Sequence, residues 1–107
     1  MTNFTDDNFE QEVIEASKQK PVLVDFFAVW CGPCKMQAPI VEAVAANLAN
    51  LAVVGKLDTE SATKTAMDYG VMSIPTLIIF RHGVAQKTFI GVQPKDVLVK
   101  ALNEYLH

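Results

Sequence analysis

The sequence predicts an α/β domain in which a mixed sheet lies between helices. Segments whose apolar residues recur with helical spacing alternate with short runs rich in β-branched and aromatic residues. The run at residues 21–29 is apolar at both parities, which is typical of a strand covered on both faces. Two later runs are joined by only a short turn, so they can pair only as antiparallel neighbours. Together these observations favour a mixed sheet over an all-helical or all-strand protein.

Length and composition limit the broad class of the protein. A chain of 107 residues is long enough to bury one core, so we expect a single domain over residues 1–107. The net charge of -3 disfavours binding to nucleic acid or acidic membranes. No apolar run approaches the roughly 18 residues of a membrane span, and the acidic beginning has no signal-peptide pattern. We therefore expect a cytoplasmic monomer that binds neither nucleic acid nor membranes.

The predicted elements follow one another as helix, strand, helix, strand, helix, strand, strand and helix. The helices are expected at residues 5–18, 34–48, 61–70 and 94–107. The strands are expected at residues 21–29, 51–58, 75–80 and 85–91, with a further short strand over residues 3–5. The prediction is thus a central mixed five-stranded sheet flanked by four helices.

Caps and spacing identify these helices. The first opens with N-capping residues and places Phe9, Val13 and Ala16 on one face. Gly70 is expected to close the third helix. Pro94 suits the first turn of the last helix, because its missing N–H is not needed there. The inward face of that helix is expected to carry Leu98, Ala101, Leu102 and Tyr105.

Both cysteines lie in the stretch WCGPC, where the central strand gives way to a helix. Cys31 and Cys34 could form a structural disulfide, half of a metal site or a redox reagent. A structural disulfide is disfavoured, because so short a loop constrains the unfolded chain little and cytosolic thiols are kept reduced. Structural zinc needs four ligands, and neither His82 nor His107 has a suitable spacing. We therefore expect a redox-active disulfide, with no metal and no bound cofactor.

The predicted position of Cys31 at a helix start favours its thiolate, because free N–H groups and the helix dipole stabilise an anion there. Lowering the thiol pKa from about 8.5 to about 7 requires roughly 2 kcal/mol. The dipole contributes about 0.3–1 kcal/mol, at most ~2, and a hydrogen bond from the Cys34 thiol could add the remainder. Gly32 lets a partner backbone come close, and Pro33 limits the freedom of the reduced dithiol. Such a pair opens and closes with little rearrangement.

Asp25 is an unusual residue for a buried strand, since buried carboxylates are costly unless they have a partner. It could form a buried ion pair with Lys56 of a neighbouring strand. Alternatively, desolvation raises its carboxyl pKa, so that it accepts a proton near neutral pH. We favour the second role, because Cys34 must lose its proton to resolve a mixed disulfide, with Lys56 tuning the acid.

Apolar residues elsewhere could surround the cysteines. Trp30, Met72, Ile74 and Val92 could belong to the core, or could form an exposed patch that binds a protein partner. Gly91 is typical of a turn and could also clear space beside the site. The sequence alone does not predict the isomer of the X-Pro bond ahead of residue 75.

These residues together give the chain a resemblance to the thioredoxin family over essentially all of its length. The resemblance rests on the stretches VDFFAVWCGPCK, KLD and YGVMSIPT, the HG turn and Gly91. It implies the thioredoxin fold, with Cys31 as attacking nucleophile, Cys34 as resolving thiol and Asp25 as proton acceptor. It also implies a cis bond before Pro75, whose backbone pairs with an extended substrate segment.

The resemblance implies a protein-disulfide reductase, that is, a general dithiol–disulfide oxidoreductase supplied with electrons by a thioredoxin reductase. Its substrates would be disulfide-containing proteins. The substrate-binding residues would be Trp30, Met72, Ile74, Pro75, Gly91 and Val92. Gly-Pro between the cysteines differs from the dipeptides of the oxidising relatives, such as disulfide isomerases. The alternative is a redox-independent binding module that uses the same apolar surface.

Two positions depart from the family pattern. The family commonly has Trp at the position of Phe27, and a polar or Gly pair at the position of Met72 and Ser73. Both positions adjoin the predicted site, so we expect them to affect partner preference and fine redox tuning, whereas the core chemistry does not depend on them.

Overall fold

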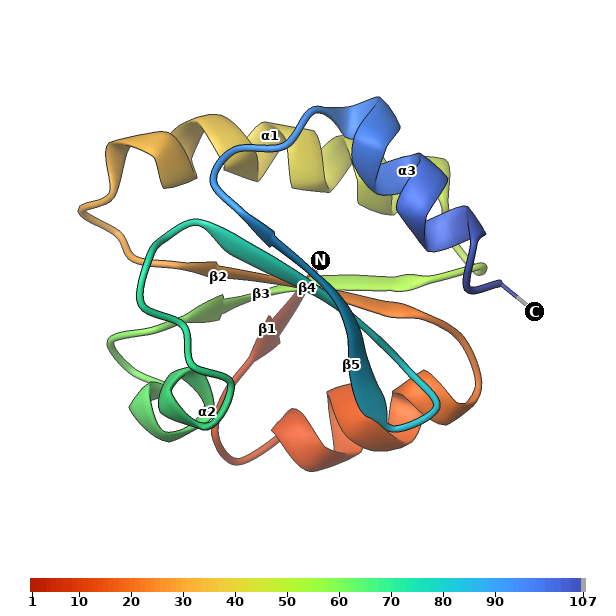
Figure 1. Cartoon of the computed structure of the whole chain (residues 1–107), viewed down its shortest axis with the longest axis horizontal. Helices are drawn as coiled ribbons and strands as arrows, with labels where there is room; N and C mark the ends of the chain where they lie inside the picture. Colours follow the sequence, from red (N-terminus) through yellow and green to blue (C-terminus); the bar gives the residue numbers. More distant parts are fainter. Residues whose placement is uncertain (107) are drawn as a thin grey trace.

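The computed structural model describes residues 1–106 and contains one five-stranded sheet with helices on both faces (Figure 1). The strands are β1 (Thr2–Phe4), β2 (Val22–Phe27), β3 (Val53–Asp58), β4 (Thr76–Arg81) and β5 (Val84–Ile90). They lie in the order β1-β3-β2-β4-β5. β3 is parallel to both β1 and β2, whereas β4 is antiparallel to β2 and β5. The predicted mixed five-stranded sheet is confirmed.

The helical elements are η1 (Glu10–Glu15), η2 (Ala16–Lys18), α1 (Gly32–Asn47), α2 (Thr63–Asp68) and α3 (Lys95–Asn103). The four predicted helices are present, the first as a π-helix, η1, that continues into a 3-10 turn, η2. In the turn ahead of it, Thr5 N–H donates to Asn8 Oδ1 at 2.8 Å, and Asn8 N–H donates to Thr5 Oγ1 at 3.1 Å. The N-cap of η1 is Phe9, which makes no side-chain capping hydrogen bond, so the predicted N-capping residues close the preceding turn and not η1 itself. The last helix ends at Asn103, and the final residue of its predicted range, 107, lies outside the described residues.

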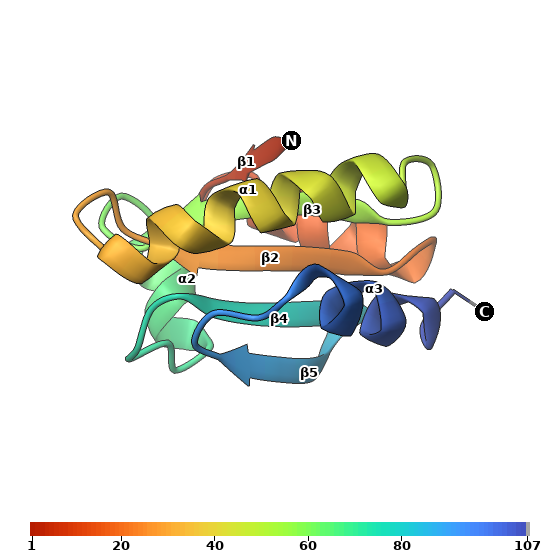
Figure 2. The same ribbon diagram turned by 90° about the horizontal axis from the view of Figure 1, so that it is seen from above.

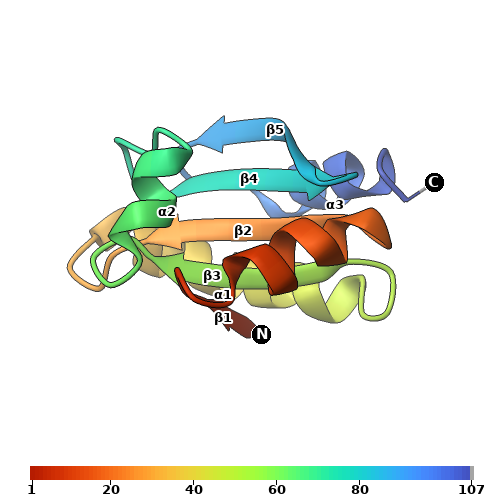
Figure 3. The same ribbon diagram turned by 90° about the horizontal axis from the view of Figure 1, so that it is seen from below.

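Helices cover the sheet on both faces. α1 and α3 lie on one face (Figure 2), and η1, η2 and α2 lie on the other (Figure 3). Because successive side chains of a strand point to opposite faces, β2 contributes to both cores. Val24 and Phe26 pack in the core beneath η1 and α2, and Leu23 packs in the core beneath α1 and α3. Asp25 therefore shares the face of Leu23 and points toward α1.

The predicted inward faces of the helices are confirmed. Phe9 and Val13 are buried in one core, with Ala16 packed against it. On α3, Leu98, Ala101 and Leu102 are buried in the other core, and Tyr105 beyond its end packs against them. Within residues 1–106, none of the helices combines the length and apolar character needed to cross a membrane.

Strand direction brings three separate loops to one end of the sheet. β2 ends there and leads into α1; β4 begins there because it is antiparallel to β2, and β5 ends there because it is antiparallel to β4. Figures 1 and 2 show the segments at residues 28–31, 70–75 and 91–94 gathered at this end. The cysteine pair therefore lies beside two chain segments that are distant from it in sequence.

Candidate active site

The cysteine pair forms a disulfide at the first turn of α1. The Cα atoms of Cys31 and Cys34 are 5.2 Å apart. Cys31 is the N-cap of the helix with extended backbone, and its Sγ accepts a hydrogen bond from the Cys34 N–H at 3.2 Å. Gly32 and Pro33 occupy the first helical positions, where the absent N–H of proline is tolerated. The predicted location of Cys31 at a helix start is confirmed.

This geometry favours negative charge on Cys31 when the disulfide is reduced. A backbone N–H already points at its sulfur, and the positive end of the α1 dipole lies beside it. Sγ of Cys31 also lies 3.7 Å from the carbonyl oxygen of Ile74. That oxygen can accept a hydrogen bond from a protonated thiol but gives no stabilisation to a thiolate. The N–H groups of the helix start therefore favour ionisation, and the Ile74 carbonyl opposes it.

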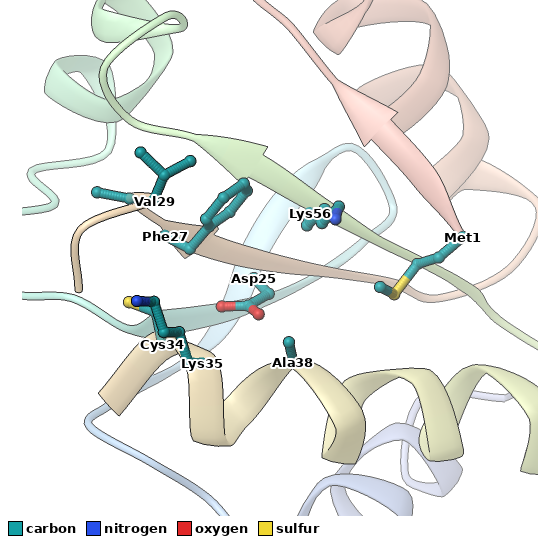
Figure 4. Close-up of a pocket in the computed structure, with 9 residues that line it drawn as sticks. Met1, Asp25, Phe27, Val29, Cys34, Lys35, Ala38 and Lys56 are labelled. Carbon is teal, nitrogen blue, oxygen red and sulfur yellow. The ribbon is translucent and has the colours of Figure 1, made fainter. Parts of the chain in front are cut away.

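A pocket of about 190 Å³ lies behind the disulfide, on the side away from Cys31. The polar and reactive groups on its wall come from β2, β3 and α1, and they are Asp25, Cys34, Lys35 and Lys56. Figure 4 shows the Asp25 carboxyl group between the helix and β3, within this pocket. The pocket therefore brings a carboxyl group and the second cysteine of the pair to the same small space.

The Asp25 carboxyl group is desolvated. Asp25 is only 3% exposed, and its Oδ1 has no hydrogen-bond partner among the described residues. Burial raises the pKa of Asp25 from 3.8 to about 7, and the charge of Lys56 opposes part of this rise. The carboxyl group can therefore gain and lose a proton near neutral pH.

Lys56 does not form the direct ion pair that was one of the two predictions for Asp25. The two residues are register partners on β2 and β3, so their side chains leave the same face of the sheet. No ion pair within 4.0 Å joins them in the described part of the chain. Instead, the Lys56 ammonium lies 5.5 Å from the centroid of the Phe27 ring, a cation–π distance. Phe27, one of the departures from the family pattern, thus contacts the cation that tunes Asp25.

Exposed apolar residues lie in the three loops that gather at the cysteine end of the sheet. Met72 is 95% exposed and Trp30 is 65% exposed, and Val92 is also exposed. Ile74 is half-buried and packs against the two cysteines. These exposed fractions support the patch interpretation over the core interpretation for Trp30, Met72 and Val92.

The segments around Pro75 and Gly91 are held together by their backbones. The Ile74–Pro75 bond is cis, as the family resemblance implies. Gly91 has φ +92, and a Cβ there would meet no atom of the chain within 4 Å. Its glycine is therefore explained by backbone conformation rather than by crowding. Gly91 N–H donates to the Pro75 carbonyl at 2.8 Å, which fixes one segment to the other.

Comparison with known proteins adds an independent line of evidence. The family model described as thioredoxin matches residues 1–104. The chain is 44% identical to the thioredoxin of Porphyra purpurea over 106 residues, covering 99% of this chain and 97% of the relative. It is 45% identical to thioredoxin 1 of Synechococcus elongatus over 102 residues, covering 95% and 94%. It is 46% identical to the thioredoxin of Alicyclobacillus acidocaldarius over 102 residues, with the same coverage. The chain belongs to the thioredoxin family.

Family membership and the Cys31–Cys34 disulfide together make the chain a dithiol–disulfide oxidoreductase of the protein-disulfide reductase class. Members of this family act on disulfide substrates and exchange electrons with reductase partners. In the range that the structure describes, no group of His, Cys, Asp and Glu side chains could hold a metal ion. His82 lies in the turn between β4 and β5, and His107 lies outside the described residues.

The sequence analysis did not identify Gln37, which is fully buried on α1 one turn after Cys34. Its Nε2 donates to the Gln93 carbonyl at 3.0 Å, and its Oε1 accepts from the Gln93 N–H at 2.7 Å. Helical spacing contained a usable signal, because Gln37 lies on the same face as the buried residues Val41 and Val44. A polar residue there needs buried hydrogen-bond partners.

Proposed function

We propose that this protein reduces disulfides in partner proteins, with Cys31 as nucleophile, Cys34 as resolving thiol and Asp25 as proton acceptor. One observation carries the assignment. The Cys31 sulfur receives the N–H at the start of α1, whereas Cys34 lies on the wall of the pocket that contains Asp25. The first environment favours a thiolate, and the second offers a base to a thiol that must lose its proton.

In the first step, the thiolate of Cys31 attacks one sulfur of a substrate disulfide. A bond forms between Cys31 Sγ and that sulfur as the substrate disulfide breaks. The second substrate sulfur leaves as a thiolate and takes up a proton from solvent. The product is a mixed disulfide between Cys31 and the substrate.

In the second step, Cys34 transfers its proton to the Asp25 carboxylate, directly or through one water molecule, and attacks Cys31 Sγ. The Cys31–Cys34 disulfide forms, the bond to the substrate breaks, and the released substrate thiolate is protonated. Two electrons have then passed from the dithiol to the substrate. A thioredoxin reductase returns them, and the cycle needs no bound organic cofactor and no metal.

The pKa of Asp25 suits this role. At about 7 it leaves a substantial fraction of the carboxyl group ionised and ready to accept a proton at neutral pH. Lys56 tunes the acid through its charge. Gly32 and Pro33 tune the pair itself, Gly32 by leaving room for the substrate backbone and Pro33 by restricting the reduced loop.

For substrate binding we propose an extended segment laid across the apolar patch. The surface consists of Trp30, Met72, Ile74, Pro75, Gly91 and Val92. Pro75 has no N–H, and its carbonyl already accepts from Gly91. Backbone pairing with the substrate therefore falls to Ile74, whose carbonyl lies 3.7 Å from Cys31 Sγ.

The direct experiment is to trap the intermediate. Cys34→Ser removes the resolving thiol but keeps the attacking one, so covalent mixed disulfides with protein substrates should accumulate through Cys31. Mass spectrometry of the adducts identifies the attached residue. Cys31→Ser is the matched control and should give no adduct. Equal trapping through Cys34 in the control would mean that the two cysteines do not have distinct roles, and trapping only in the control would reverse the two assignments.

We propose that the protein acts as a monomer in the cytoplasm. Its net charge of -3 supports repulsion between copies and disfavours acidic surfaces. Sedimentation at increasing concentration tests the monomer, and fractionation of cells tests the compartment. Redox-independent binding would be supported instead if a Cys31→Ser, Cys34→Ser double variant kept full biological activity.

A further inference from the structure

Gln37 makes two hydrogen bonds to one backbone unit that lies 56 residues away. Its side-chain amide donates to the Gln93 carbonyl and accepts from the Gln93 N–H, at 3.0 and 2.7 Å. The amide thus satisfies both polar groups of Gln93 in the same way that a neighbouring strand would. With no exposed surface, Gln37 is shielded from competing water, which strengthens both bonds.

These bonds belong to a longer connection. Gln93 Nε2 lies 3.4 Å from the Gly91 carbonyl, and Gly91 N–H donates to the Pro75 carbonyl at 2.8 Å. A continuous set of hydrogen bonds therefore runs from Pro75 through Gly91 and Gln93 to Gln37. It joins the two segments of the proposed docking surface to the helix that begins at the cysteine pair.

Stability of the α1 core alone does not explain a glutamine at this position. The buried neighbours of Gln37 on the same helix face include Val41 and Val44, and an aliphatic side chain there would add apolar burial. Gln93 lies in a half-exposed segment, where water could satisfy its backbone groups in place of Gln37. What the glutamine adds is a fixed position for that segment.

We propose that Gln37 is a positioning residue that holds residues 91–93 of the docking surface in register with the cysteine helix. This proposal deepens the function proposed above and rests on it. Cys34 and Gln37 are one turn apart on α1, so the segment is fixed to the same part of the helix that carries the resolving thiol. A segment already held in its binding position loses less conformational freedom when substrate binds.

The first test measures the contact itself. Gln37→Met keeps the length of the side chain but removes both hydrogen bonds, so hydrogen exchange of the Gln93 amide should quicken at least about tenfold. Gln86→Met is the matched control, because Gln86 Nε2 also donates to a backbone carbonyl, that of Arg81, at 3.0 Å. The control should leave Gln93 exchange unchanged. Unaltered exchange in Gln37→Met would overturn the proposal.

The second test measures the consequence for substrates. The assay follows the reduction of the disulfides of insulin, used as a protein substrate. In this assay Gln37→Met should raise KM about threefold to tenfold, while kcat stays within about twofold. The rate with a small aromatic disulfide, dithiobis-nitrobenzoate, should match that of the unsubstituted protein, because this reagent is too small to use the docking segment. Gln86→Met should match the unsubstituted protein in both assays.

Other outcomes would contradict the proposal in different ways. Faster Gln93 exchange with unchanged KM would mean that the segment is held by Gln37 but does not determine substrate binding. An equal loss with insulin and with the small disulfide would mean that Gln37 acts on the cysteine pair instead. If the unsubstituted protein reduced the small disulfide but not insulin, the proposed function would fail, whatever the exchange experiment gave.

Discussion

The two cysteines differ in their surroundings far more than in their accessibility. Both residues are 4% exposed in the disulfide form. Cys31 lies at the N–H groups of a helix start and beside the exposed patch, whereas Cys34 borders a pocket with a desolvated carboxyl group. Two identical side chains within one helical turn are therefore prepared for different steps. Neighbouring charges and hydrogen-bond donors, rather than exposure, therefore assign the roles of the two thiols.

Removing the charge of the Asp25 carboxyl group tests the surroundings described for Cys34. The displacement of the Asp25 pKa from 3.8 to about 7 corresponds to at most ~4 kcal/mol of unfavourable burial when the group is ionised. Because the folded pKa is raised, this destabilisation is absent below about pH 4, develops between about pH 4 and 7, and is complete above pH 7.

Asp25→Asn should therefore raise the free energy of unfolding by about 2–4 kcal/mol at pH 8 and change it little at pH 3.5. Denaturant unfolding at both pH values measures the difference. Asp96→Asn, an exposed position in the first turn of α3, serves as the control and should not raise the free energy of unfolding at pH 8. An Asp25→Asn effect that is the same at both pH values would mean that the carboxyl group is not desolvated.

A smaller effect is expected from the cation that opposes this burial. The Phe27 ring holds the Lys56 ammonium at 5.5 Å, without an ion pair to Asp25. Phe27→Leu removes the cation–π contact, so Lys56 can approach the carboxylate and should lower the pKa of Asp25 by roughly half a pH unit. Phe27→Trp keeps an aromatic ring beside Lys56, so the Asp25 pKa should match that of the unsubstituted protein, because indole binds cations at least as well as the phenyl ring. Carbon NMR of the Asp25 carboxyl group follows the titration.

Lys56→Met separates two possible causes of a lower Asp25 pKa in Phe27→Leu, the approach of Lys56 and the entry of water into the pocket. By itself it should raise the Asp25 pKa, because the favourable charge is lost. Added to Lys56→Met, Phe27→Leu should then have no lowering effect. If it lowered the pKa equally in both backgrounds, water entering the pocket would be the cause, and Phe27 would not act through the lysine.

The sequence predicted those features that depend on local pattern. The order of elements, the mixed sheet and the helix start at Cys31 follow from spacing, caps and short connections. Asp25 could be singled out because a carboxylate in an apolar strand is costly wherever its partner lies. Such features need only neighbouring residues, or general rules of strand pairing, to be determined.

The remaining features depend on where distant side chains meet. Whether Lys56 pairs with Asp25 or with Phe27 is a choice between two nearby groups on one sheet face, and strand pattern does not decide it. The contact between Gln37 and Gln93 joins positions 56 residues apart. The π-winding of η1 and the cis bond before Pro75 are conformational choices whose sequence signals are weak.

The central claim is that Cys31 is the ionised and reactive thiol of the pair. The most direct measurement is the pH dependence of alkylation of the reduced protein, with mass spectrometry to identify the modified residue. We predict preferential modification of Cys31, with a midpoint clearly below the roughly 8.5 of an ordinary thiol. A midpoint near pH 8.5, or preferential modification of Cys34, would contradict it.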